Sequence, residues 1–126
     1  MGINSQSAAY QLGQFGSVFT DEATAVEPPA GKAIVAITFL EDTTLDTHGN
    51  GGLVADTSQV DSNNAGTAFF GTATSPGGTT GAYGTGAAEV DNATKFPAGL
   101  TIYGRWTKVK LGGASTTGGI ICYFGD

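Results

Sequence analysis

The most continuous hydrophobic segment of the chain is residues 32–40, with the sequence Lys-Ala-Ile-Val-Ala-Ile-Thr-Phe-Leu. The two-residue alternation of a β-strand gives this segment two apolar faces. One face carries Ala33, Val35, Ile37 and Phe39, and the other carries Ile34, Ala36 and Leu40. A strand that is apolar on both faces is typical of a central strand covered on both sides. We therefore predict a strand over 32–40 at the centre of a sheet.

A second hydrophobic pattern lies in the last third of the chain and changes its parity. Leu100 and Ile102 share one face of an expected strand, whereas Val109 and Leu111 fall on the opposite parity. Such a change within one strand requires a bulge or a bend, and glycine is the residue that most readily permits it. We therefore predict a β-bulge at Gly104.

Beyond this strand, the Gly/Ser/Thr-rich segment 112–119 indicates a loop. The chain then returns through 120–124, which is rich in β-branched and aromatic residues. These features predict an antiparallel hairpin of 100–111 with 120–124. The only tryptophan, Trp106, is expected in the packed face of that hairpin, with the neighbouring side chain on the opposite side of the strand.

The same short motif precedes both expected strands. Pro-Ala-Gly occupies residues 29–31 ahead of the first strand and residues 97–99 ahead of the second. Proline presets φ for the early position of a turn and glycine accepts the positive φ of a later one. We interpret the two motifs as two turns of the same kind rather than as an internal repeat.

The rest of the chain has weaker patterns. Residues 1–20 mix small polar residues with spaced aromatics, Tyr10, Phe15 and Phe19. Two readings are open: an extended arm that docks on a neighbouring chain through these aromatics, or a first edge strand of the domain's own sheet. Residues 46–95 are rich in Gly, Thr, Asn and Ser. This stretch holds either short strands near 52–56, 67–74 and 87–91, or a surface lobe ordered by neighbouring subunits.

Length and composition indicate one β domain over residues 1–126, with an arm at 1–20, a core at 32–126 and a loop-rich insertion at 46–95. We predict an all-β fold, a small antiparallel sandwich or jelly-roll-like barrel with long Gly/Thr-rich loops. The chain contains 21 glycines, and many of its hydrophobic residues are alanines, which bury little area. Because such a core is small, we expect a homotrimer.

The chain is acidic, with a net charge of −6 and a pI near 4.4. This balance argues against binding to nucleic acid. Most of the few cations lie in the C-terminal third and most acids in the first half. Arg and Trp are enriched at interface hot spots, so we predict that Arg105 lies at a contact between chains and that an acid of the first half is its partner.

The residues offer little catalytic or metal-binding chemistry. His48 is the only histidine, and the segment from Asp46 to Gly51 resembles the front of a calcium loop. Thr57 stands where that loop requires a bidentate Glu, so a local turn is the better interpretation. We expect no enzymatic activity, cofactor or metal. The single cysteine, Cys122, is expected to be a buried hydrophobe. No signal-peptide pattern follows Met1 and no segment has transmembrane length, so we expect cytoplasmic synthesis and no membrane partner.

Two segments carry a resemblance to a known class of proteins. The run 96–107, Phe-Pro-Ala-Gly-Leu-Thr-Ile-Tyr-Gly-Arg-Trp-Thr, and the closing 120–125, Ile-Ile-Cys-Tyr-Phe-Gly, resemble the C-terminus of small virion proteins of tailed bacteriophages, especially marine and cyanobacterial phages. The segment 33–44 is similar to a central strand of the same proteins. The resemblance implies a capsid decoration or cement protein that binds the major capsid protein in the virion. The alternative is a phage fibre or adhesion module that binds a surface glycan.

Overall fold

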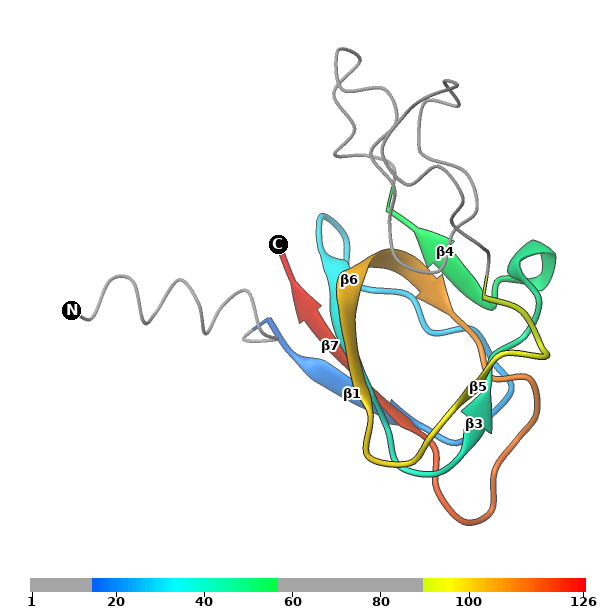
Figure 1. Cartoon of the computed structure of the whole chain (residues 1–126). Helices are drawn as coiled ribbons and strands as arrows, with labels where there is room; N and C mark the ends of the chain where they lie inside the picture. Colours follow the sequence, from blue (N-terminus) through cyan, green and yellow to red (C-terminus); the bar gives the residue numbers. More distant parts are fainter. Residues whose placement is uncertain (1–14, 57–89) are drawn as a thin grey trace.

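The computed structural model describes residues 15–56 and 90–126, and their regular structure consists of antiparallel β-strands (Figure 1). The elements are β1 (Ser17–Thr20), β2 (Ala33–Phe39), β3 (Thr43–Thr44), a 3-10 turn η1 (His48–Asn50), β4 (Leu53–Ala55), β5 (Lys95–Phe96), β6 (Thr101–Val109) and β7 (Ile120–Gly125). The predicted all-β antiparallel class is confirmed. The sheets do not close into a barrel.

Five of the strands form one sheet in the order β1-β7-β2-β6-β4 (Figure 1). The hairpin predicted from the C-terminal third is therefore wrong, because β6 and β7 are not paired with each other. The central position between them is taken by β2, which hydrogen-bonds to both. The prediction that 32–40 forms a central strand is confirmed.

The length of the loop between β6 and β7 explains why these two strands do not form a hairpin. The connection from β6 to β7 spans residues 110–119, which is longer than the two to five residues typical of a hairpin loop. A long loop does not impose pairing between the strands that it joins. Pairing with β6 on one edge and with β7 on the other satisfies the backbone hydrogen-bonding groups of β2 on both sides, so the loop 110–119 joins two strands that are not neighbours.

The two Pro-Ala-Gly motifs form turns of the same kind, as predicted. The amide of Lys32 donates to the carbonyl of Pro29 at 3.0 Å, and the amide of Leu100 donates to the carbonyl of Pro97 at 3.3 Å. The glycine at the third position of each turn has a positive φ, which is 77° at Gly31 and 85° at position 99. Both turns deliver the chain into a long strand of the sheet.

One face of the sheet forms the hydrophobic core. The strand register aligns side chains into rows across it: Val18, Cys122, Ile37 and Ile102 make one row, and Phe124, Ile34 and Trp106 make the next. Except for Val18, which packs against the cluster from β1, these residues are buried within it. Trp106 is fully buried, which confirms its predicted place in the packed face.

The register of β6 against its neighbours is irregular at two places. Ile34 pairs with Trp106 and Ala36 with Tyr103, so two steps along β2 oppose three along β6. This interval contains Gly104, but the core residues Ile102 and Trp106 keep the same parity across it, so the change of parity predicted at Gly104 is wrong. A second shift lies between Trp106 and Lys108, opposite β4. It accounts for the change of parity toward the buried Val109.

A two-stranded ribbon, β3 paired with β5, covers part of the core face of the large sheet. Phe96 of β5 stacks on Phe39 of β2 with the ring centroids 4.5 Å apart and the ring planes nearly parallel. Leu45, which follows β3, bridges to Leu111 and is fully buried. The ribbon and the large sheet therefore enclose the core between them.

The structure decides only part of the alternatives left open for residues 1–20 and 46–95. Ser17–Thr20 forms an edge strand of the domain's own sheet, whereas Tyr10 and most of the expected arm lie outside the described residues. The short strand expected near 52–56 is present as β4. The segment 67–74 and most of 87–91 also lie outside the described residues, and Val90 and Asp91 are not in a strand.

Candidate functional site

The face of the large sheet that points away from the core is open. Strand alternation places two further rows of side chains there: Thr101, Thr38, Ile121 and Phe19 form one, and Tyr103, Ala36, Tyr123 and Ser17 form the other. Phe19 is 54% exposed and Tyr103 is 63% exposed. The expectation that β2 is covered on both faces is therefore wrong for this side, because these large rings remain open to solvent. Antiparallel sheets commonly have one face packed and one solvated.

A groove of about 190 Å³ lies on this open face. Its lining residues are Ala36, Thr38, Thr101, Tyr103 and Tyr123. The register explains its shape, because Ala36 lies opposite Tyr103 on one side and opposite Tyr123 on the other. The small side chain of Ala36 forms the floor between two phenol rings. At one end, the hydroxyls of Thr38 and Thr101 hydrogen-bond to each other at 2.8 Å.

Two of the aromatic residues that the sequence predicted at an interface, Phe15 and Phe19, lie in or just before the edge strand β1. Phe19 lies on the open face beside Ile121 of β7. Phe15 lies just before the strand, where the ammonium group of Lys32 is 3.9 Å from the centroid of its ring. The ring of Phe15 is about one-third exposed, 37%. The structure therefore presents Phe19 to solvent and engages Phe15 in a contact within the chain.

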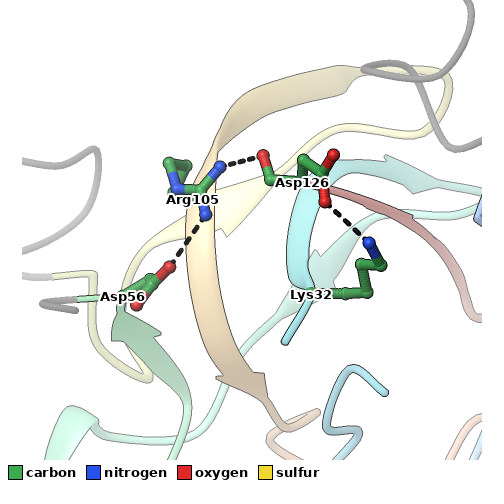
Figure 2. A network of polar contacts seen from close by, with 4 residues as sticks. All are labelled: Lys32, Asp56, Arg105 and Asp126. Carbon is green, nitrogen blue, oxygen red and sulfur yellow. Dashed lines mark hydrogen bonds and ion pairs between the residues drawn. The ribbon is translucent and has the colours of Figure 1, made fainter. Parts of the chain in front are cut away.

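Arg105 lies in a polar network within its own chain (Figure 2). Its Nη2 is 3.0 Å from a carboxylate oxygen of Asp56, and its Nη1 donates to the backbone carbonyl of Asp126. The side chain of Asp126 in turn binds the ammonium of Lys32 at 2.7 Å. The guanidinium joins the end of β4 to the end of the chain. Asp56 is an acid of the first half, as expected of the partner, but the contact lies within one chain.

The burial of this network is unequal. The Asp56 side chain is only 6% exposed, whereas that of Arg105 is 27% exposed. A buried carboxylate is costly without a cation or hydrogen-bond donors. Arg105 supplies the positive charge beside it. This contact therefore assigns Arg105 a role in holding β4 and β6 together.

Every lysine and arginine of the chain is paired with a carboxylate. The pairs are Lys32–Asp126, Lys95–Asp42, Arg105–Asp56, Lys108–Glu27 and Lys110–Asp46. Most of them join an acid of the first half to a base of the C-terminal third. The charge asymmetry of the sequence thus serves contacts between distant segments of one chain.

The segment that resembled a calcium loop forms a local turn. One carboxylate oxygen of Asp46 accepts the amide of Thr47 at 2.8 Å and the side-chain amide of Asn50 at 3.3 Å. The other lies 3.2 Å from the ammonium of Lys110. These donors lower the pKa of Asp46, the backbone amide of Thr47 contributing most. Because the carboxylate is already occupied, the interpretation as a turn is the better one.

A second carboxylate has partners that the sequence did not reveal. Glu41 accepts hydrogen bonds from the hydroxyls of Ser115 and Thr117, in the loop between β6 and β7. These two bonds, Ser115 first, lower the pKa of Glu41. Ser115 Oγ also accepts the amides of Thr117 and Gly118, at 3.2 and 3.0 Å. The Ser/Thr content of the loop 112–119 was the only hint in the sequence that its hydroxyls bind a carboxylate. Which carboxylate they reach depends on the path of the loop in the folded chain.

Two further features carry no site chemistry. Cys122 is fully buried, and desolvation raises the pKa of its thiol to about 12, as its apolar surroundings predicted. A broad surface depression of about 800 Å³ lies between the prolines of 28–29 and the Asn50 turn. Both lysines that line it are already paired with carboxylates, Lys108 with Glu27 at 3.2 Å and Lys32 with Asp126 at 2.7 Å.

No group of three or more His, Cys, Asp or Glu side chains suited to a metal ion occurs within 15–56 and 90–126. No helix in the described part of the chain is long and apolar enough to cross a membrane. The chain matches no family model, no curated protein and no solved structure. The geometry of the open face and of β1 is therefore the basis for any functional argument.

Proposed function

We propose that this chain is a structural protein of a tailed-phage particle, a decoration or cement protein that docks on the major capsid protein and stabilises the shell. The observation that carries the proposal is the exposed ring of Phe19 on the edge strand β1. An edge strand offers backbone donors and acceptors to a strand of another protein, and a neighbouring aromatic ring supplies an anchor.

The charge pattern supports an apolar mode of docking. Each lysine and arginine already has a carboxylate partner within the chain, so the chain offers no unpaired Lys or Arg side chain to a negatively charged surface. Main-chain hydrogen bonds and burial of apolar area depend little on ionic strength, whereas exposed ion pairs are screened over roughly 8–10 Å at physiological salt. Shell binding should therefore persist when the salt concentration is raised.

The experiment combines particle analysis with a binding assay. A decoration protein should be present in hundreds of copies per purified particle, as expected for a component that covers a shell. The full chain should bind shells from which it has been stripped, and Phe19→Ser should weaken this binding by about tenfold or more, as loss of an aromatic hot spot does. The matched control is Leu100→Ser, an exposed apolar residue beside β6, three strands away from β1. Equal loss for both variants, or none for Phe19→Ser, would reject the docking surface.

We also propose that the docked form is a homotrimer. The support is the small core and the high glycine content, which leave little buried area per chain. Native mass spectrometry of the full chain, alone and released from shells, should give the mass of three chains. An isolated folded monomer in both samples would contradict the trimer without affecting the docking proposal.

The second candidate is a fibre or adhesion module that binds a surface glycan. The groove between Tyr103 and Tyr123 favours it, because aromatic side chains beside hydroxyl groups suit a sugar. A fibre protein should be present in tens of copies per particle. Copy number therefore separates the two candidates before any binding measurement.

A further inference from the structure

We infer that the groove between Tyr103 and Tyr123 is a binding site for a single neutral pyranose ring, such as one residue of a surface polysaccharide. It deepens the second candidate function, on which it rests, by naming the kind of sugar residue that the groove would take. Four features support it: the spacing of the two rings, the volume of the groove, the hydroxyl groups at one end, and the absence of charge in the lining.

The spacing follows from the strand register. Tyr103 on β6 and Tyr123 on β7 both lie opposite Ala36 on β2, so their backbones are separated by two strand spacings, about 9.5 Å. A ring held in contact between two aromatic groups needs roughly 7–8 Å between them, two contacts of about 3.5–4 Å. The side chain of Ala36 is only 4% exposed, so its neighbours cover most of the floor. A six-membered ring would therefore lie against the exposed side chain of Tyr103 at the mouth of the groove.

The volume agrees with a ligand of this size. The groove has a volume of about 190 Å³ and is open to solvent. Pockets that hold whole drug-sized molecules are larger, roughly 300–1,000 Å³. The C–H bonds on the face of a pyranose carry partial positive charge, and the face of an aromatic ring is negative. A pyranose thus matches the two walls in shape and in polarity.

The hydroxyl pair supplies the polar contact. Thr38 and Thr101 share one hydrogen bond of 2.8 Å, in which only one of the two hydroxyls donates. The proton of the other hydroxyl takes no part in this bond, and lone pairs remain on both oxygens. A sugar hydroxyl is both donor and acceptor, so it complements this pair. A purely apolar ligand would leave the pair without additional partners.

The charge pattern selects a neutral ligand. No charged side chain lines the groove, and the chain has a net charge of −6. An anionic sugar such as a sialic acid would find no cation there, and the field of the protein would repel it. These observations distinguish a neutral pyranose from the acidic sugars found on many cell surfaces.

The test is saturation-transfer-difference NMR on the full chain. The neutral probes are the methyl glycosides of glucose, mannose and galactose at millimolar concentration, and the anionic comparison is N-acetylneuraminic acid. At least one neutral probe should show transfer to its ring protons, and the anionic probe should show none. Absence of transfer to all three neutral probes, or stronger transfer to the anionic one, would overturn the inference.

Variants locate the site. Tyr103→Ser removes one wall at an exposed position and should weaken binding by about tenfold. Ala36→Leu fills the groove and should abolish transfer. Phe19→Ser, which removes an exposed ring elsewhere on the same sheet, should leave it unchanged. Retained binding in Tyr103→Ser, with unfolding in urea like that of the parent, would reject the site.

The same variants separate this inference from the shell-docking function. Tyr103→Ser should bind stripped shells as the parent does, whereas Phe19→Ser should not. If Tyr103→Ser lost shell binding and the parent showed no sugar transfer, the groove would belong to a protein interface. Failure of shell docking with sugar binding intact would instead reject the decoration function alone.

Discussion

The indole ring of Trp106 lies over the backbone of Gly104. A β-carbon built at Gly104 would come within 2.6 Å of Cζ2 of Trp106, closer than real side-chain contacts allow. Trp106 is fully buried between the two layers, so its ring has little freedom to move. The absence of a side chain at Gly104 therefore makes room for the largest core side chain.

Gly104→Ala should consequently destabilise the protein by about 1–3 kcal/mol, as overpacking of a core does. Urea unfolding followed by tryptophan fluorescence measures it directly. Gly113→Ala is the matched control, because nothing lies within 4 Å of a β-carbon there. Its effect should stay within about 0.5 kcal/mol. Equal stability of the two variants would contradict the close packing of Trp106 on Gly104.

Arg105→Ala should lower the free energy of unfolding by about 1–3 kcal/mol, because it removes the cation beside a largely buried carboxylate. The side chain of Arg105 is itself about one-quarter exposed, which keeps the effect below that of a fully buried pair. Thermal and urea unfolding of the full chain measure the loss. The sequence-based suggestion that Arg105 also lies at a contact between chains stays a prediction.

Two further variants test whether the loss of stability in Arg105→Ala comes from its pair with Asp56. Lys95→Ala breaks an exposed pair with Asp42, in which the nitrogen–oxygen distance is 3.6 Å, and should cost less than about 1 kcal/mol. The double variant Arg105→Ala with Asp56→Ala should lose less than the sum of the two single losses, since the residues are in direct contact. Additive losses would show that the pair does not couple.

Acid should destabilise the protein partly through Asp46 and Glu41. Hydrogen bonds lower the pKa of both in the folded state, so each contributes stability that is present above its unfolded pKa. That contribution is lost as the pH falls through the folded pKa, below the usual values near 3.8 and 4.5. Stability measured from pH 7 to pH 3 should therefore decline below about pH 4.5.

The variant Asp46→Asn should show a shallower decline than the parent, because it removes one of the groups that titrates. Glu22→Gln, which removes a negative charge from an exposed position in the β1–β2 connection, serves as the matched control. It should retain the pH dependence of the parent. A parent-like slope in Asp46→Asn would exclude Asp46 from the acid response.

Cys122 should be inert in the folded protein. With its pKa raised to about 12 by burial, only about one thiol in ten thousand is ionised at pH 8, and the thiolate is the reactive form. Labelling by Ellman's reagent should be very slow in native buffer and rapid in urea, where the pKa returns to about 8.5. Rapid labelling of the native protein would contradict the burial of β7.

Local features of this fold were predictable from local sequence. The Pro-Ala-Gly turns at 29–31 and 97–99 depend only on the φ preferences of proline and glycine, and the structure contains both. The opposite parity of Ile102 and Val109 predicted an irregularity in this strand, and the structure places the change of parity between Trp106 and Lys108 rather than at Gly104. The apolar run 32–40 predicted a central strand, and β2 has neighbours on both edges, although one face of the sheet carries exposed rings instead of the cover that was expected.

Nonlocal relationships needed the tertiary structure. The sequence predicted the strands 100–111 and 120–124 but not that β2 inserts between them, because hydrogen bonds between strands carry no signature in either strand alone. For the same reason Asp56 was not identifiable as the partner of Arg105. The groove arises only when β6, β2 and β7 align Tyr103, Ala36 and Tyr123. The apolar pattern and the local Pro-Ala-Gly motifs thus determined the class of fold and its turns. The pairing of strands that are distant in the sequence decided which side chains form the groove and the ion pair of Arg105.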